Sequence, residues 1–163
     1  SEGLIQRVAL LKGLEHSVLQ RVYDERLIFN PGAEKMLKKL KVAGIKTMLI
    51  SGGFTFFTDK LKDRLGLDYT FANTLETVNG RLTGRLLGEV FGAKGKGWAL
   101  NKICNELGFR KENLIAIGDG ANDLSMFAEA GVSIAYHAKP IVQENATYAI
   151  NHVGLDGVIN IFQ

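Results

Sequence analysis

The chain has 163 residues, of which 46% are hydrophobic and 23% charged, and its formal net charge is +3. This length fits one domain with a sizeable core, and the composition excludes intrinsically disordered, collagen-like and disulfide-scaffold proteins. The single cysteine and the lack of a signal-peptide profile predict a cytoplasmic, enzyme-like domain. No apolar run approaches the roughly 18 residues of a membrane span, and there is no basic tail. We therefore expect neither a membrane nor nucleic acid as partner.

The first 50 residues predict three helices and a strand. Short apolar faces within residues 1–26 predict two short helices. Asn30 and Pro31 predict the N-cap and the first residue of a third helix, which Gly44 ends. The largely apolar run 45–50 then predicts a strand of a parallel sheet that is covered on both faces.

The middle of the chain predicts a helix and a hairpin. Phenylalanines and leucines on one side of residues 54–65 indicate a helix that stops at Gly66. Strand-like runs then flank Asn79 and Gly80, a pair that is the strongest short signal for a hairpin. We expect a small hairpin within 69–87 that projects from the main sheet.

The second half alternates helices with short buried strands. The apolar spacing from Leu100 to Leu107 predicts a helix with Cys104 in the core. Further strands are expected at 114–117, 132–135 and 148–150, with helices at 124–130, after Pro140 and at the C-terminus. This alternation predicts an α/β fold with a doubly wound, parallel, Rossmann-like sheet.

Ligands of such sheets bind beyond the carboxyl ends of the strands, so the residues that follow the strands are candidates for the site. Ser51, Gly52 and Gly53 place a hydroxyl and several N–H groups before a helix, an arrangement that suits phosphate. Taken alone, this tripeptide is more typical of a plain tight turn.

A more specific motif, GDGAND, follows the strand at 114–117. Its carboxylates at Asp119 and Asp123 are hard oxygen ligands that suit Mg²⁺. The alternative is an Asx-type turn with a helix cap, which Asp123 could form without Asp119. Lys94 and Lys96 lie in a glycine-rich link and could reach a phosphate as point charges, although each alone is typical of an exposed lysine.

Together these motifs resemble a known family. SGGF at 51–54, Lys96 placed 23 positions before Asp119, and GDGAND at 118–123 are similar in order and spacing to the haloacid dehalogenase superfamily. The resemblance to its phosphoserine phosphatases extends over essentially the whole chain. It implies an enzyme that uses Mg²⁺ to hydrolyse O-phosphoserine to serine and phosphate through a phosphoaspartate.

The resemblance also implies the residues that bind the phosphoryl group. The Ser51 hydroxyl and the Gly52 N–H would donate hydrogen bonds to it, and Asn122 would contact it. Lys96, rather than Lys94, would neutralise charge on the nucleophile and the phosphate.

Three further roles follow from the resemblance. Asp119 would be the Mg²⁺ ligand, and Asp123 would hold the lysine or the groups around the metal. Arg7 would pair with the carboxylate of the substrate, a task that suits a bidentate guanidinium.

The nucleophile of the family is absent from the sequence. In the family an aspartate of a DxDx[TV] motif on the first strand attacks phosphorus, and the second aspartate acts as general acid and base. No DxD occurs in the chain. We therefore expect residues 1–26 to be a remnant of a helical cap and 27–163 to be a phosphatase core that lacks its central first strand. The chain alone is expected to be inactive. Its expected protein partner is a second copy of itself, in a homodimer, or a complementing chain that supplies the missing strand.

Other functions remain open at this stage. The chain could belong to another small-molecule phosphatase or phosphotransferase of the superfamily, or it could be a non-catalytic module that binds phosphate. A nucleotide-binding regulatory domain is less favoured, because neither GxGxxG nor GxxxxGK[ST] occurs.

Overall fold

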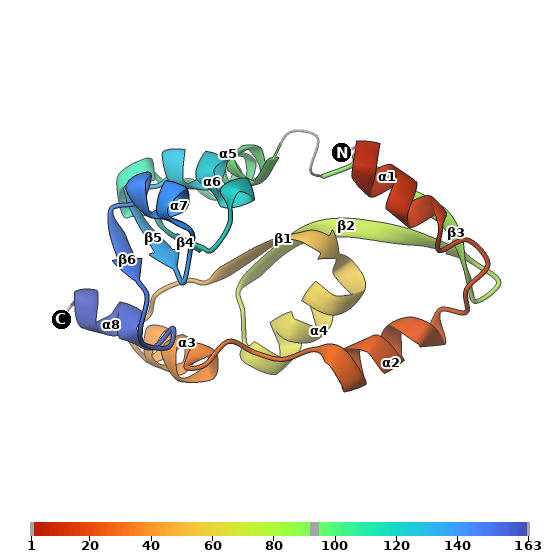
Figure 1. Cartoon of the computed structure of the whole chain (residues 1–163), viewed down its shortest axis with the longest axis horizontal. Coiled ribbons are helices and arrows are strands. Elements are labelled where there is room, and N and C mark those ends of the chain that lie inside the picture. The colour runs from red at the N-terminus through yellow and green to blue at the C-terminus, as the bar shows by residue number, and fades with distance from the viewer. Residues whose placement is uncertain (1, 92–94, 163) are drawn as a thin grey trace. The chain divides into compact units, whose positions relative to one another are not determined.

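The computed structural model describes residues 2–91 and 95–162, which divide into two compact units (Figure 1). One unit comprises Ser1–Phe29 and Ile45–Ala93, and the other comprises Asn30–Gly44 and Lys94–Gln163. Among the described residues, no helix is long and apolar enough to cross a membrane. Each unit contains its own three-stranded sheet.

The described residues of the first unit form three helices and three strands. They are α1 (Glu2–Ala9), α2 (Ser17–Arg26), β1 (Met48–Phe54), α4 (Thr55–Leu65), β2 (Tyr69–Val78) and β3 (Arg81–Leu87). The first half of β2 pairs in parallel with β1, and its second half pairs antiparallel with β3. Helix α4 packs against β1 and β2.

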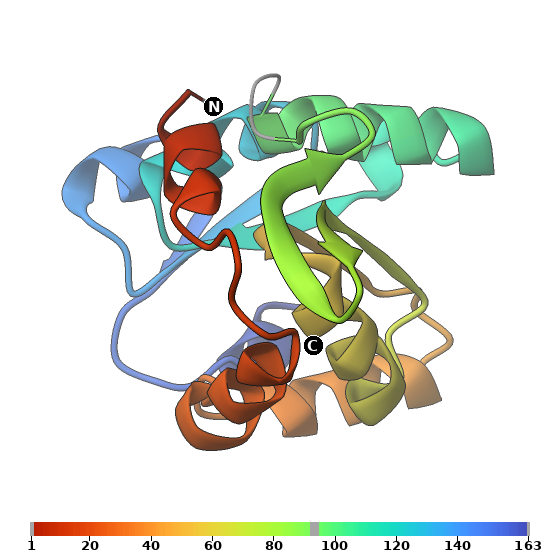
Figure 2. The ribbon, with the colours of Figure 1, turned by 90° about the vertical axis from the view of Figure 1, so that its right-hand side faces the viewer.

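The predicted hairpin is confirmed. Asn79 and Gly80 join β2 to β3 with φ angles of 52° and 76°, the pair of positive values that a type I′ turn requires. In Figure 2, α1 lies beside this hairpin. A Cβ at Gly84 would lie 3.0 Å from the Cβ of Lys12, so the glycine allows the chain that follows α1 to approach β3 closely.

The second unit has a fully parallel sheet with helices on both faces. Its strands are β4 (Ile115–Gly118), β5 (Val132–Tyr136) and β6 (Tyr148–Ile150), in the order β4-β5-β6. Its helices are α3 (Ala33–Val42), α5 (Gly95–Leu107), α6 (Leu124–Ala128), α7 (Pro140–Glu144) and α8 (Gly157–Ile161), with 3₁₀ turns η1 (Lys111–Asn113) and η2 (Ala121–Asp123).

The core of this unit confirms the double winding. Met36 of α3 and Val158 of α8 are buried against Ile134, Tyr136 and Ile150 of the sheet. Helices α5, α6 and α7 lie on the opposite side of the sheet from α3 and α8 (Figure 1). Cys104 is buried in α5, as its spacing predicted.

Two predicted boundaries are wrong. Helix α3 begins at Ala33, because Gly32 precedes it in a left-handed conformation (φ 80°) and the Pro31 carbonyl accepts a hydrogen bond from the Leu155 N–H. Asn30 and Pro31 are therefore outside the helix. Strand β1 begins at Met48 and continues beyond residue 50, to Phe54.

Candidate active site

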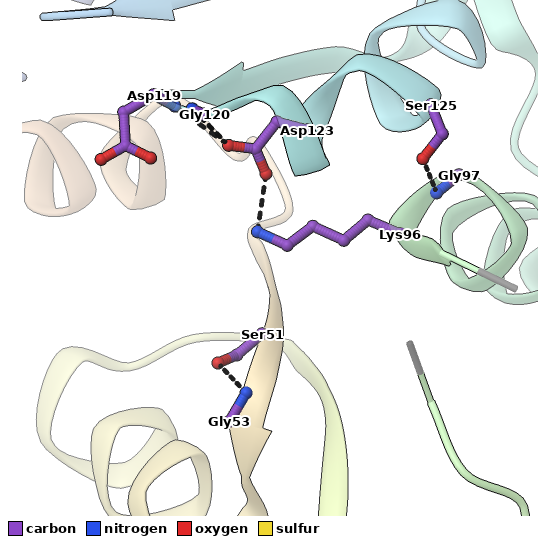
Figure 3. A network of polar contacts seen from close by, with 8 residues as sticks. All are labelled: Ser51, Gly53, Lys96, Gly97, Asp119, Gly120, Asp123 and Ser125. Carbon is purple, nitrogen blue, oxygen red and sulfur yellow. Dashed lines mark hydrogen bonds and ion pairs between the residues drawn. The ribbon is translucent and has the colours of Figure 1, made fainter. Parts of the chain in front are cut away.

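Asp123 organises the loop that follows β4 (Figure 3). Its Oδ2 accepts hydrogen bonds from the backbone N–H groups of Asp119 (3.0 Å) and Gly120 (3.1 Å). A Cβ at Gly118 would lie 2.5 Å from the Cβ of Asp123, so this strand end needs a glycine there. Both bonds run back to residues three and four positions before Asp123, whereas an Asx-type turn bonds an N–H that follows the aspartate. Asp123 also forms no side-chain cap of α6, so the alternative of an Asx-type turn with a helix cap is wrong.

The second oxygen of the Asp123 carboxylate, Oδ1, accepts a hydrogen bond from Lys96. Lys96 lies in the first turn of α5, not in the preceding link, and its Nζ is 2.6 Å from Asp123 Oδ1. The side chains of Lys96 and Asp123 are 17% and 3% exposed. A pair this well shielded from water is held more firmly than a surface ion pair. Lys94, the alternative lysine, lies outside the described residues.

Asp119 is the exposed carboxylate of the loop, and in Figure 3 it points away from Asp123. Its carboxylate oxygens make no hydrogen bond or ion pair with the described residues. Within those residues, no group of three or more His, Cys, Asp or Glu side chains could hold a metal ion. An exposed carboxylate with no partner among the described residues is a hard oxygen donor, the ligand type that suits a cation such as Mg²⁺.

Ser51 and Gly52 lie in an irregular part of β1. Between the pairs Ile50–Phe71 and Phe54–Asn73, β1 advances by four residues while β2 advances by two. The Ser51 hydroxyl accepts a hydrogen bond from the Gly53 N–H at 3.0 Å (Figure 3), and Gly52 is exposed. This bulge interrupts the regular pairing of β1 with β2 just before α4 begins.

Two other predicted residues are solvent-exposed. Arg7 is an exposed residue of α1, and it forms no hydrogen bond or ion pair with the rest of the described chain. Asn122 is exposed in η2, beside Gly120. The structure thus joins Lys96, Asp119 and Asp123 in one network of the second unit, whereas Arg7, Ser51 and Gly52 belong to the first unit.

A family model for haloacid dehalogenase-like hydrolases matches residues 4–131. A phosphoserine phosphatase of Polaromonas sp. is 50% identical over 98% of this chain and 70% of its own length. The chain belongs to the haloacid dehalogenase-like hydrolases. It is therefore an enzyme chain, as the sequence motifs implied.

Further relatives of this hydrolase support the fold. The phosphoserine phosphatase of Archaeoglobus fulgidus is 44% identical over 99% of this chain and 47% of its own length. The crystal structure of a probable phosphoserine phosphatase from Vibrio cholerae, in unliganded form, matches with a TM-score of 0.90 and 44% identity, over 97% of this chain and 49% of that one. The predicted Rossmann-like α/β fold is confirmed by this match.

Sequence reasoning missed two residues that support the site of this hydrolase. Asn73 is buried, accepts a hydrogen bond from the Phe91 N–H at 2.7 Å and donates one to the Gly52 carbonyl at 3.4 Å. Ser125 accepts a hydrogen bond from the Gly97 N–H at 3.0 Å. Asn73 had one sequence signal, since asparagine is uncommon in a strand-like run.

Proposed function

We propose that this chain is part of a phosphoserine phosphatase and supplies most of the groups that bind its phosphoryl group. The observation that carries the proposal is the network at the end of β4, where a shielded lysine is fixed by Asp123 while Asp119 stays exposed. A fixed cation and an exposed carboxylate that are held by the same aspartate suit a phosphate with its metal ion. The names of the relatives indicate O-phosphoserine as the substrate.

Each proposed residue contributes binding or orientation. Lys96 neutralises charge on the phosphate, and Ser51 and Gly52 donate hydrogen bonds to its oxygens. Asn122 contacts the same group. Mg²⁺ held by Asp119 would neutralise charge that develops on the phosphate oxygens.

Arg7 is proposed to recognise the carboxylate of the substrate. Its guanidinium has no partner among the described residues, and a bidentate pair with a carboxylate would satisfy it. In this arrangement residues 1–26 act as part of a cap, and 27–163 act as the core that binds phosphate and metal.

We propose that the phosphoaspartate of the reaction forms on a residue outside this chain. Asp123 has both carboxylate oxygens engaged, and Asp119 is assigned to the metal. The remaining aspartates lie on helices α2 and α4 or pair with lysines: Asp24, Asp59, Asp63, Asp68 and Asp156. The chain by itself is therefore expected to release no phosphate, and a complementing chain or a longer protein would supply the nucleophile.

The first experiment combines intact mass with phosphate release from O-phosphoserine, with and without Mg²⁺. A sample with the mass of the 163-residue chain should show no release. Mg²⁺-dependent release at that mass would overturn the proposal that the nucleophile lies elsewhere.

The second experiment tests the substrate. The part of the Polaromonas relative that this chain does not match is joined to it in a hybrid protein. We expect Mg²⁺-dependent hydrolysis of O-phosphoserine, and much slower hydrolysis of O-phosphoethanolamine, which lacks the carboxylate. The variant Arg7→Met should remove this preference, whereas Arg110→Met, a control on the surface of the other unit, should keep it. Equal rates on both substrates before mutation would contradict the assignment of Arg7, and a hybrid that binds phosphate without hydrolysing any ester would favour a non-catalytic module.

A further inference from the structure

The first turn of α5 is held by a side chain from another helix. The N–H groups in the first turn of a helix have no partner within that helix and are usually capped by a preceding side chain. Here the Gly97 N–H donates instead to the hydroxyl of Ser125, on α6, at 3.0 Å (Figure 3). Ser125 therefore acts as a cap for a helix that begins 30 residues before it.

Both glycines that flank Lys96 are packed against Ser125. A Cβ at Gly97 would lie 2.7 Å from the backbone carbonyl carbon of Ser125, closer than real side chains approach. Gly95 has a φ of 79°, and a Cβ there would lie 3.3 Å from the Ser125 hydroxyl oxygen. The absence of side chains at 95 and 97 lets α5 approach α6 closely at this point.

Two contacts thus connect the same two short segments. Lys96 reaches Asp123 through its side chain, and the adjacent Gly97 reaches Ser125 through its backbone. A lysine has many rotamers, so fixing its ammonium group on one carboxylate oxygen is entropically unfavourable. The contact at Ser125 reduces that freedom because it fixes the backbone from which Lys96 extends.

We infer that Ser125 is a positioning residue that holds the Lys96 ammonium group on Asp123. The consequence for catalysis rests on the proposed function, but the positioning itself does not. It is measured directly on the 163-residue chain, by NMR of the lysine ammonium group.

The test compares Ser125→Ala with Ser125→Thr in ¹⁵N-labelled chain. The Lys96 ammonium resonance is assigned by its disappearance in Lys96→Met, and its proton exchange rate is measured. In the parent chain this exchange is expected to be slow, because the group is mostly buried and hydrogen-bonded. Ser125→Ala should accelerate the exchange at least about threefold and move the resonance toward that of exposed lysines. Ser125→Thr, which keeps the hydroxyl, should restore the slow exchange.

Controls separate positioning from general destabilisation. Ser17→Ala changes a serine in the first turn of α2, in the other unit, and should leave the Lys96 resonance unchanged. If Ser125→Ala does not fold, as judged by circular dichroism, Ser125→Cys replaces it, since a thiol is a much weaker acceptor. A folded Ser125→Ala or Ser125→Cys chain with an unchanged Lys96 resonance would overturn the inference.

The hybrid protein provides the catalytic readout. Loss of one hydrogen bond that acts through Lys96 should lower kcat/KM for O-phosphoserine by about threefold to tenfold. The threonine variant should recover most of that loss. An inactive hybrid would contradict the proposed function and leave the NMR result standing, so the two failures are distinguishable.

Discussion

The Lys96 ammonium nitrogen lies 2.6 Å from Asp123 Oδ1, while the other oxygen of the same carboxylate accepts hydrogen bonds from the backbone N–H groups of Asp119 and Gly120. One carboxylate therefore fixes both the lysine and the loop that contains Asp119. The Asp123 side chain is only 3% exposed, so water has little access to either set of contacts. Any change to this carboxylate should disturb the loop and the lysine together.

The variant Asp123→Asn tests this double role. An amide has one acceptor oxygen, so its NH₂ group must face either the Lys96 ammonium group or the N–H groups of Asp119 and Gly120. We expect a loss of about 3 kcal/mol in the free energy of unfolding, as when one partner of a buried pair is removed. Urea denaturation provides the measurement.

The matched control is Glu112→Gln in the same unit. Glu112 lies 3.9 Å from Arg110, and the two side chains are 69% and 80% exposed. Exposed pairs contribute about 0–1 kcal/mol, so this variant should unfold almost like the parent chain. Equal losses in both variants would mean that burial of the Lys96–Asp123 pair has no energetic consequence.

The segment between α1 and α2 should depend on Arg81. Its guanidinium donates to the Gly13 carbonyl at 2.8 Å and lies 3.6 Å from Glu15, where the segment pairs with β3. The Gly13 N–H donates to the Leu82 carbonyl of β3, and the His16 N–H donates to the Gly80 carbonyl in the turn before it. Arg81→Met keeps the apolar stem but removes the guanidinium contacts, so both amides should exchange with deuterium several-fold faster. Arg110→Met should not change that exchange, and unchanged rates in Arg81→Met would show that the backbone hydrogen bonds suffice alone.

Local signals predicted most of the fold. Asn79 and Gly80 adopt the positive φ angles that their residue types favour, and Gly66 ends α4 in a left-handed conformation. The start of α3 was predicted wrongly because a distant group decides it. The Pro31 carbonyl accepts a hydrogen bond from the Leu155 N–H, more than a hundred residues away in the chain. The sequence around Pro31 gives no sign of that contact.

The same distinction applies to the site. Lys96 and Asp119 stand in motifs whose spacing is visible in the sequence. Asn73 and Ser125 act through hydrogen bonds to Phe91 and Gly97, which are 18 and 28 residues away. Such partners meet only after folding, so the sequence could at most mark Asn73 as an unusual residue in a strand, and only the structure shows which groups Asn73 and Ser125 bind.

Gly80, in the hairpin turn, tests how much a positive φ angle alone costs, because a side chain there would clash with no neighbouring atom. A Cβ at Gly80 would meet no atom within 4 Å, but its φ of 76° is unfavourable for other L residues. Gly80→Ala should lower the free energy of unfolding by about 1–2 kcal/mol. Gly3→Ala is the matched control, since its Cβ also has open space but its backbone is helical, and it should stabilise the chain by up to about 1 kcal/mol. Equal effects in urea denaturation would contradict the conformational explanation.

Cys104 should make stability depend on pH in the alkaline range. Burial raises the pKa of its thiol above the ordinary value of 9.0. The contribution of the protonated thiol to the free energy of unfolding is fully present below about pH 9, where the folded and the unfolded chain both keep the proton. It is lost as the pH rises toward the folded-state pKa, because the unfolded chain releases the proton first. Between pH 8 and pH 10, the free energy of unfolding should fall more in the parent chain than in Cys104→Ala, by up to about 1.4 kcal/mol per pH unit above 9. All other ionisable groups are the same in the two chains, so the difference between their pH profiles isolates the thiol. Parallel pH profiles would show that Cys104 ionises as readily in the folded chain as in the unfolded one.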